Sequence, residues 1–195
     1  MAVWDYPAAL TPQHMEWRTL KAGTQFVSPF TSATESVEFP GARWALSLTL
    51  PPCKPANGGQ AEAFFGRLAG GVERVRLGHF LRPVPRGSMR GAPTLAEAAV
   101  RGQDFLKLAT AGTLAAGDFF KVGGQLFRVF QDCAPLAGVL TVPLVQRVRG
   151  SLANGAAVEW DRPTALFIMP AMSAGVSFSP GVQAGAAVEL VEVFA

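Results

Sequence analysis

The one concentration of charged side chains in the sequence is a group of arginines. It comprises Arg74, Arg76, Arg82, Arg86 and Arg90, in a window without Asp or Glu, and Arg101 extends it. Such a cluster could neutralise phosphates, or it could pair with carboxylates at a protein interface. Lysine is scarce and no nucleic-acid-binding motif accompanies the arginines, so an interface or surface role is favoured over nucleic acid.

The side chains that could act as nucleophiles or bases lack partners in the sequence. There is no Gly-x-Ser-x-Gly elbow, and Cys53 follows two prolines with no histidine nearby. His14 is expected to face solvent from a strand, and His79 to be packed or at the surface. No His or Cys pair has metal-ligand spacing and no phosphate or dinucleotide loop is present. The sequence therefore predicts no metal, no cofactor and no enzyme activity.

Four carboxylates could in principle supply an acid/base pair. Asp118, Asp132, Glu159 and Asp161 lie near turns, and paired carboxylates hydrolyse glycosides. Aspartates in turns usually cap their own backbone instead. We therefore expect these four to have structural roles.

The composition indicates what kind of fold positions these residues. Of the 195 residues 49% are hydrophobic and only 16% are charged, with a net charge of +3, 21 glycines and 15 prolines. Few charges and many chain-breaking residues favour short strands joined by turns over a helical bundle. Cys53 and Cys133 are too few for a disulfide scaffold. They could form one disulfide, but free thiols in a reducing compartment are favoured. We expect a mainly β protein.

Alternating apolar residues mark the strands of a first β domain, residues 1–99. The clearest strand is 42–50, where every second residue from Trp44 is large and apolar. A second is 14–20, a short extended segment is 36–39 before Pro40 and Gly41, and a last strand is 186–194. Residues 171–195 are expected to return to this antiparallel sheet.

One helix is expected at about residues 58–69. Its apolar stripe consists of Ala61, Phe64, Phe65 and Leu68, at helical spacing. We expect Asn57 to cap its start and the two glycines at 70–71 to end it. This helix would pack on the first sheet.

Residues 100–170 have the pattern of a small inserted annex. Gly123 and Gly124 separate two short apolar runs and predict a two-residue hairpin turn. Further short runs at 139–145, 158–160 and 165–169 indicate a β-barrel-like or twisted sheet of three to five strands.

The stretch from Pro163 to Val188 carries no charge. Its three prolines and three glycines interrupt any helix that could span a bilayer. We therefore expect no membrane association, and we expect the stretch to be buried in the core or against another subunit.

Two sets of motifs resemble a known family. The first is WDYPAALTPQHMEWRTL, followed by FVSPF and FPGARWALSLTLPP; the second is AAGDFFKVGGQLFRVFQD, continuing to DRPTALFIM. This arrangement is similar to that of the distal tail proteins of long-tailed bacteriophages, over most of residues 4–170. The chain departs from larger relatives in having no room for a large carbohydrate-binding C-terminal domain.

The resemblance implies a structural role. Distal tail proteins form a closed ring, commonly a homohexamer, that joins the tail tube protein to the tail hub protein. DNA passes through the lumen without specific binding. The first domain would then be ring-forming, and the protein would lie at the tail tip of the virion after assembly in the host cytoplasm.

A ring subunit needs two different adhesive surfaces. The candidate interface residues are the N-terminal aromatics, three arginines and three residues of the uncharged stretch: Trp4, Tyr6, Arg82, Arg86, Arg90, Phe167, Met169 and Phe178. Two alternatives remain open, a tail-associated cell-wall hydrolase and a nucleic-acid-binding module of the virion interior.

Overall fold

A computed structural model describes residues 1–52, 55–175, 178–179, 182–183 and 185–194. It is mainly β with one helix, as the composition predicts. The chain forms two compact units, each built from separated segments. Unit 1 comprises Met1–Thr19, Arg43–Leu77 and Ala165–Ala195, and unit 2 comprises Leu20–Ala42 and Gly78–Thr164. The sequence-based boundaries follow residues 99 and 170, whereas the units divide after Leu77 and Thr164.

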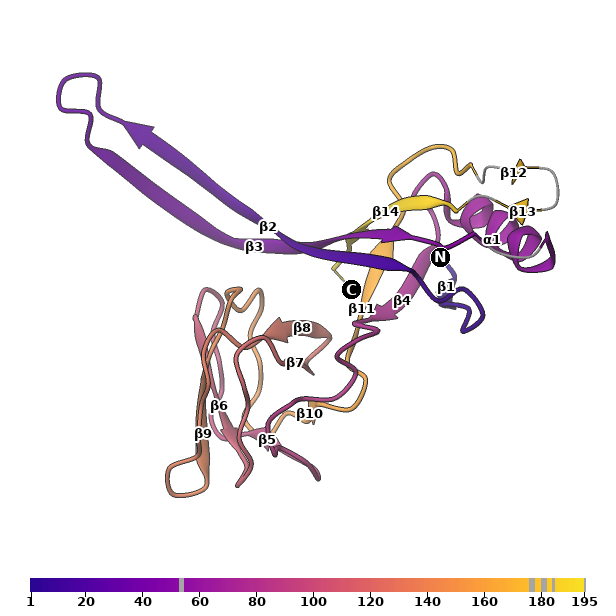
Figure 1. Cartoon of the computed structure of the whole chain (residues 1–195). Helices are drawn as coiled ribbons and strands as arrows, with labels where there is room; N and C mark the ends of the chain where they lie inside the picture. Colours follow the sequence, from indigo (N-terminus) through magenta and orange to yellow (C-terminus); the bar gives the residue numbers. More distant parts are fainter. Residues whose placement is uncertain (53–54, 176–177, 180–181, 184, 195) are drawn as a thin grey trace. The chain divides into compact units, whose positions relative to one another are not determined.

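Strands from both ends of the chain form one six-stranded sheet (Figure 1). Its order is β1 (Val3–Asp5), β4 (Arg74–Gly78), β11 (Thr164–Ile168), β14 (Ala187–Glu192), β3 (Thr34–Thr49) and β2 (His14–Val27). β1 pairs with β4 in parallel, whereas β14 runs antiparallel to β11 and to β3. The last strand of the chain therefore lies between β11 and β3.

The alternation that predicts β3 is the alternation of its buried face. Trp44, Leu46 and Leu48 are almost fully buried. Val188 and Leu190 of β14 lie opposite Leu48 and Leu46 in the register and are buried with them. Cross-strand apolar pairs of this kind are the units that stabilise a sheet.

The predicted break at Pro40 and Gly41 is wrong, because β3 is continuous through both residues. β14 pairs with β3 only along Ala45–Thr49, so the segment around Pro40 has β2 as its one neighbour in the sheet. A proline is tolerated where one side of a strand is unpaired, since no ladder hydrogen bond is lost there. β2 is also longer than expected and ends at Val27.

Helix α1 spans Pro55–Leu68. Its predicted stripe is confirmed, since Ala61, Phe65 and Leu68 are almost fully buried. The predicted cap is wrong: the helix begins with Pro55, a residue favoured at the first helical position, so Asn57 lies inside the first turn. The helix ends as expected, at two glycines with φ of 87° and 69°.

Unit 2 contains two three-stranded sheets. One has the order β10 (Val158–Glu159), β7 (Phe119–Val122), β8 (Gln125–Arg128), and the other β5 (Thr94–Leu95), β6 (Phe105–Ala109), β9 (Val139–Pro143). Isolated bridges between Thr94 and Ala157 and between Val129 and Leu144 link the edges of the two sheets. The arrangement is barrel-like, although the ladders of the described strands do not form one continuous closed sheet.

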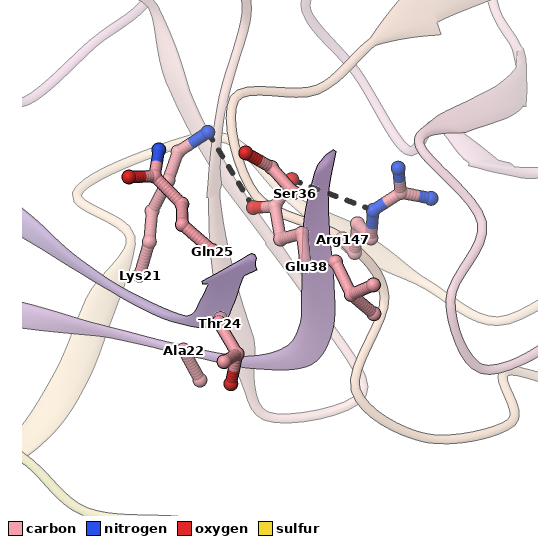
Figure 2. Close-up of a pocket in the computed structure, with 9 residues that line it drawn as sticks. Lys21, Ala22, Thr24, Gln25, Ser36, Glu38 and Arg147 are labelled. Atoms are coloured by element: carbon pink, nitrogen blue, oxygen red, sulfur yellow. Dashed lines mark ion pairs between the residues drawn. The ribbon is translucent and has the colours of Figure 1, made fainter. Parts of the chain in front are cut away.

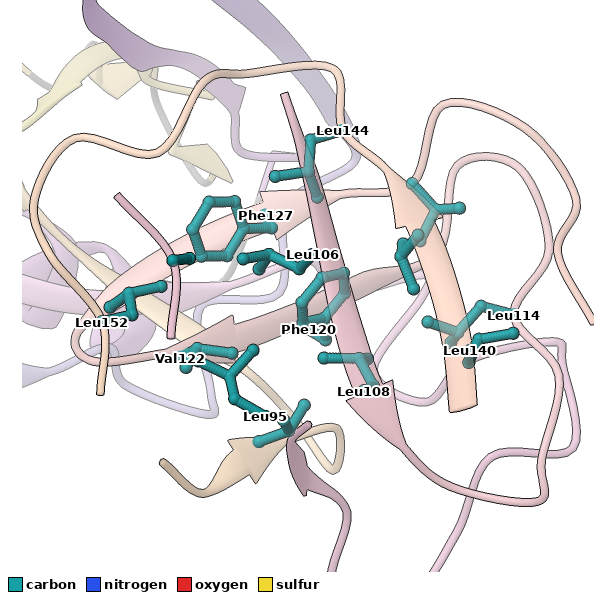
Figure 3. Close-up of a cluster of buried hydrophobic side chains, with 14 of the residues drawn as sticks. Leu95, Leu106, Leu108, Leu114, Phe120, Val122, Phe127, Leu140, Leu144 and Leu152 are labelled. Carbon is teal, nitrogen blue, oxygen red and sulfur yellow. The ribbon is translucent and has the colours of Figure 1, made fainter. Parts of the chain in front are cut away.

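The predicted two-residue turn in unit 2 is confirmed. Val122 pairs with Gln125, and Gly123 and Gly124 between them have φ of 55° and 83°. Sixteen buried apolar residues fill the core beneath this hairpin, with the rings of Phe120 and Phe127 stacked at 5.6 Å (Figure 3).

The uncharged stretch contributes strands to unit 1. β11 was expected in the annex but pairs with β14 of the six-stranded sheet. β12 (Phe178–Ser179) and β13 (Val182–Gln183) form a separate two-stranded pair. Within the described ranges, no helix has the length and hydrophobicity needed to cross a membrane.

Candidate functional site

The two longest strands form a ribbon whose outer part we call the hairpin arm, residues 20–42. Lys21 Nζ lies 3.4 Å from Glu38 Oε1, which places these two side chains on the same face of the arm. A Cβ built on Gly41 would lie 3.6 Å from Ala22 Cβ, so residues 22 and 41 share the opposite face. Because side chains alternate along strands, these two contacts fix the face of every residue in the arm.

The face of the arm that carries Ala22 and Gly41 is exposed and mainly apolar, although Thr24 and Glu35 also lie on it. Leu20 and Phe26 lie an even number of residues from Ala22 in β2, and Val37 and Phe39 an even number from Gly41 in β3, so all four are on this face. Their side chains are 46%, 59%, 42% and 51% exposed, respectively. Phe30, in the turn between the strands, is 94% exposed. Clustered exposed apolar side chains mark surfaces that bind another molecule.

The opposite face of the arm is polar and contacts the rest of unit 2. Figure 2 shows Glu38 between two cations, with its Oε1 3.4 Å from Lys21 Nζ and its Oε2 3.7 Å from Arg147 Nε. Lys21, Glu38 and Arg147 line a pocket on this face, and Gln25 and Ser36 line it as well. The arm therefore has one face matched to charged partners inside its own unit and one apolar face without such a match.

Unit 1 carries an apolar groove beside helix α1, which we call the α1 groove. Trp4 and Pro7 form one wall, Ala63, Phe64 and Leu68 of the helix form the other, and its volume is about 330 Å³. Trp4 is 43% exposed.

Glu73 holds two side chains of the α1 groove in place. Its carboxylate accepts hydrogen bonds from Trp4 Nε1 and, at 2.9 Å, from Arg67 Nε. Arg67 Nη2 lies 2.8 Å from the same carboxylate, and its guanidinium lies 5.8 Å from the centre of the Trp4 ring. Arg67, the charged residue that lines the groove, is therefore already paired with Glu73.

Two of the predicted interface residues lie at or beside the α1 groove. Trp4 lines it, and Tyr6 packs edge-on against Phe64 with ring centres 5.8 Å apart. The Tyr6 hydroxyl donates a 2.7 Å hydrogen bond to the carbonyl oxygen of Leu10, and burial raises the pKa of this phenol.

The other apolar candidates have different positions. Phe167 and Met169 are 0% and 4% exposed, so they belong to the core of unit 1 and cannot form an interface. Phe167 lies in β11, where its ring meets the Trp17 ring edge-on with centres 5.7 Å apart, and Met169 directly follows this strand. Phe178 lies in β12, and its side chain is outside the described residues.

The predicted interface arginines are bound to carbonyl oxygens of their own unit. Arg82 Nη1 lies 3.3 Å from the carbonyl oxygen of Gly117, and Arg86 donates to a neighbouring carbonyl of the same turn. Arg90 donates to three carbonyls of its own loop and lies 5.1 Å from the centre of the Trp160 ring. Arg82 and Arg86 therefore tie the loop at residues 82–90 to Ala116 and Gly117, whereas Arg90 stabilises the loop itself.

Asp118 is the buried acid of unit 2, with 2% of its surface exposed. Its Oδ1 accepts the backbone N–H of Arg86 at 3.0 Å, and its Oδ2 accepts those of Gly87 at 3.1 Å and Ala115 at 2.8 Å. It therefore binds two loops together through their backbones. This is the structural role expected for an aspartate near a turn.

Two further candidate carboxylates have structural partners. Asp132 accepts the backbone N–H of Ala116 at 2.7 Å, and Glu159 pairs with Lys121 at 3.0 Å. Among the residues that the structure describes, no cluster of three or more His, Cys, Asp and Glu could hold a metal ion.

Cys133 is a free thiol in a half-buried position. Burial raises its pKa, and its Sγ lies 3.5 Å from the carbonyl oxygen of Leu114. A protonated thiol is a poor nucleophile. Cys53 lies outside the described residues.

His79 is a histidine with a strongly lowered pKa. Its ring packs on Phe119 with centres 5.3 Å apart. Burial, and after it the charges of Arg82 and Arg128, lowers the pKa of His79 from 6.5 to about 4. The imidazole is therefore neutral in the folded protein over the whole range above about pH 4.

This neutral histidine predicts a pH-dependent stability. Between pH 6.5 and about 4 the unfolded chain binds a proton that the folded chain does not, so stability falls as the pH falls through this window. After discounting for solvent screening of a half-exposed ring, we expect a loss on the order of 1–2 kcal/mol. Urea titrations at pH 7.0 and 4.5 should show it, and His79→Gln should reduce it.

The sequence did not reveal the exposed apolar face of the hairpin arm. Its signal was a pair of apolar residues at even spacing on each side of the Ser-Pro-Phe turn, Leu20 and Phe26 before it and Val37 and Phe39 after it. The segment between them is polar, and Pro40 suggested a break, so the two strands were not joined.

No protein-family model matches the chain, and no curated protein matches it either.

Proposed function

We propose that this chain is a structural virion subunit that assembles into a closed ring at the tip of a long bacteriophage tail. The observation that carries the proposal is the hairpin arm, which presents an exposed apolar face and a fully exposed phenylalanine. The tail-protein motifs quoted above support the same function, and one of them, FVSPF, forms the end of β2 and the turn of this arm.

An apolar face on a two-stranded ribbon requires a covering surface. Such ribbons are marginally stable alone in water. Each exposed phenylalanine also leaves apolar area in solvent, which burial would stabilise at about 25 cal/mol per Å². Contact with further copies supplies the covering surface, and head-to-tail contacts that close on themselves give a ring.

The partners in this proposal follow from the resemblance. The ring, commonly of six copies, joins the tail tube protein to the tail hub protein, and DNA passes through its lumen without specific contacts. The protein would reside in the virion after assembly in the host cytoplasm.

The rival functions have less support from the geometry. A cell-wall hydrolase needs two carboxylates that converge on a substrate, whereas Asp118 and Asp132 accept backbone N–H groups and Glu159 pairs with a lysine. A nucleic-acid-binding module binds phosphates through Lys and Arg side chains, but no nucleic-acid-binding motif accompanies the arginines of this sequence.

The assembly of the purified protein tests the proposal. Sedimentation velocity across a wide concentration range should reveal a single higher oligomer, and particle images of it should show a ring with an open centre. A protein that stays monomeric at every concentration, or that clears peptidoglycan in a zymogram, would contradict the proposal. A salt-dependent shift of short DNA would favour the nucleic-acid-binding alternative.

A further inference from the structure

We propose that the tip of the hairpin arm of one copy inserts Phe30 into the α1 groove of the next copy. This inference rests on the proposed ring and names the contact that closes it. Both surfaces lie within single units of the chain, the tip in unit 2 and the groove in unit 1.

The turn at the tip is held in one conformation by its own hydrogen bonds. Ser28 Oγ accepts the backbone N–H of Phe30 at 3.4 Å and of Thr31 at 3.3 Å. The backbone N–H of Ser28 donates to the carbonyl oxygen of Ala33 at 2.9 Å. Phe30 is therefore presented on a preorganised turn, which lowers the entropy lost on binding.

The α1 groove is the matching receptor for an aromatic side chain. Trp4 lines it from one side, and Ala63, Phe64 and Leu68 of the helix line it from the other. Aromatic side chains favour edge-on and offset contacts with other rings. An aromatic anchor that fills a preformed apolar groove is the usual centre of a protein interface.

The charges of the two surfaces match. Residues 27–34 at the tip carry no charged side chain. The charged residue at the groove, Arg67, is paired with Glu73 through two of its nitrogens. Docking of the tip therefore buries no unpaired charge, a burial that would otherwise cost several kcal/mol.

The exposed apolar area of the arm fits a partner of protein size. At 150–250 Å² for each aromatic side chain, the exposed parts of Phe26, Phe30 and Phe39 present on the order of 400 Å². That is about half of the ~800 Å² that each partner contributes to a standard protein interface. The flat face of the arm, including Leu20 and Val37, extends the contact beyond the tip. Each copy of this chain carries one tip and one groove, so every copy in a ring takes part in two such contacts, one through each surface.

A mixing experiment tests the contact. Phe30→Asp places a charge at the tip, and Ala63→Glu places one in the groove, both at exposed positions where folding should be preserved. Each variant alone should associate about 30-fold or more weakly, as expected when an interface anchor is lost. Mixed together they should form a 1:1 dimer and nothing larger, since each supplies one intact surface. Leu81→Asp and Val100→Glu are the matched controls at other exposed apolar positions, and both should assemble as the wild type does.

Each other outcome has a definite meaning. If the wild type forms the ring and both variants do too, the tip–groove contact is wrong and the ring stands. If only Ala63→Glu assembles normally, the tip binds elsewhere and the groove assignment is wrong. If the mixture yields no dimer although each variant is monomeric, the tip does not bind the groove of another copy. A monomeric wild type would overturn the proposed function itself.

Discussion

Replacing Asp118 with alanine is expected to destabilise unit 2 by about 3–5 kcal/mol. The carboxylate accepts the backbone N–H groups of Arg86, Gly87 and Ala115, and its side chain is 2% exposed. Alanine leaves those three donors without an acceptor, in a position from which water is largely excluded. Each such donor costs about 1–3 kcal/mol. Asp118→Asn should lose less, because it keeps one oxygen acceptor.

Hydrogen exchange in urea, resolved to individual peptides, measures the loss separately in the two units. The strands β7 and β8 of unit 2 should become exchangeable at lower urea in Asp118→Ala, while peptides of unit 1 keep their protection. Asp132→Ala is the matched control, since Asp132 is exposed and accepts only the backbone N–H of Ala116. It should cost about 1 kcal/mol. Equal losses in the two variants would contradict the role assigned to Asp118.

The elements that local patterns specify were predictable from the sequence. The alternation from Trp44 to Leu50 gave the core part of β3, because one face of that strand is buried and one is not. The stripe on α1 followed from helical spacing. The turn at Gly123 and Gly124 followed from its requirement for positive φ at both positions.

Features that depend on distant partners were not predictable in this way. The continuity of β3 through Pro40 depends on β14, which joins the chain's last residues to Ala45–Thr49 and leaves Pro40 beyond their pairing. Phe167 and Met169 were assigned to an interface because their segment lacks charge. Burial in a core and burial against a partner leave the same signal in the sequence, and only the pairing of β11 with β14 distinguishes them.

The candidate site was predictable in part for the same reason. Trp4 was identified from its type and position, but its place in a groove depends on Glu73 and on helix α1. To identify the apolar face of the hairpin arm, one must know which side chains of β2 and β3 lie on the same face. The Lys21–Glu38 ion pair and the approach of Gly41 to Ala22 show this. A periodic pattern interrupted by a turn specifies a face only when the turn length is known.

The second large effect is expected for Gly112→Ala, which should destabilise unit 2 by about 3 kcal/mol. A Cβ at Gly112 would lie 2.4 Å from Met89 Cα and 2.6 Å from Met89 N, and backbone atoms cannot rotate away. A second contact between the same two segments is equally close, because a Cβ at Gly87 would lie 2.1 Å from the carbonyl oxygen of Thr113. The two segments cross at a distance that only glycine permits.

Met89 explains why this crossing matters to the unit. Its side chain is 0% exposed in the core of unit 2, and its backbone N–H donates to the carbonyl oxygen of Thr113 at 3.1 Å. Alanine at Gly112 must move either that hydrogen bond or the buried methionine. Gly150→Ala is the matched control, since a Cβ there meets no atom within 4 Å, and it should change stability by no more than about 0.5 kcal/mol.

The two variants also test whether the crossing and the buried acid act as one structure. Gly87 takes part in both, since its N–H binds Asp118 and its Cα faces Thr113. By pushing the two segments apart, Gly112→Ala should therefore already weaken the hydrogen bond from the Gly87 N–H to Asp118. The double variant Gly112→Ala, Asp118→Ala should lose less stability than the sum of the single losses, measured by the same urea-dependent exchange. Strict additivity would mean that the crossing and the carboxylate stabilise unit 2 independently.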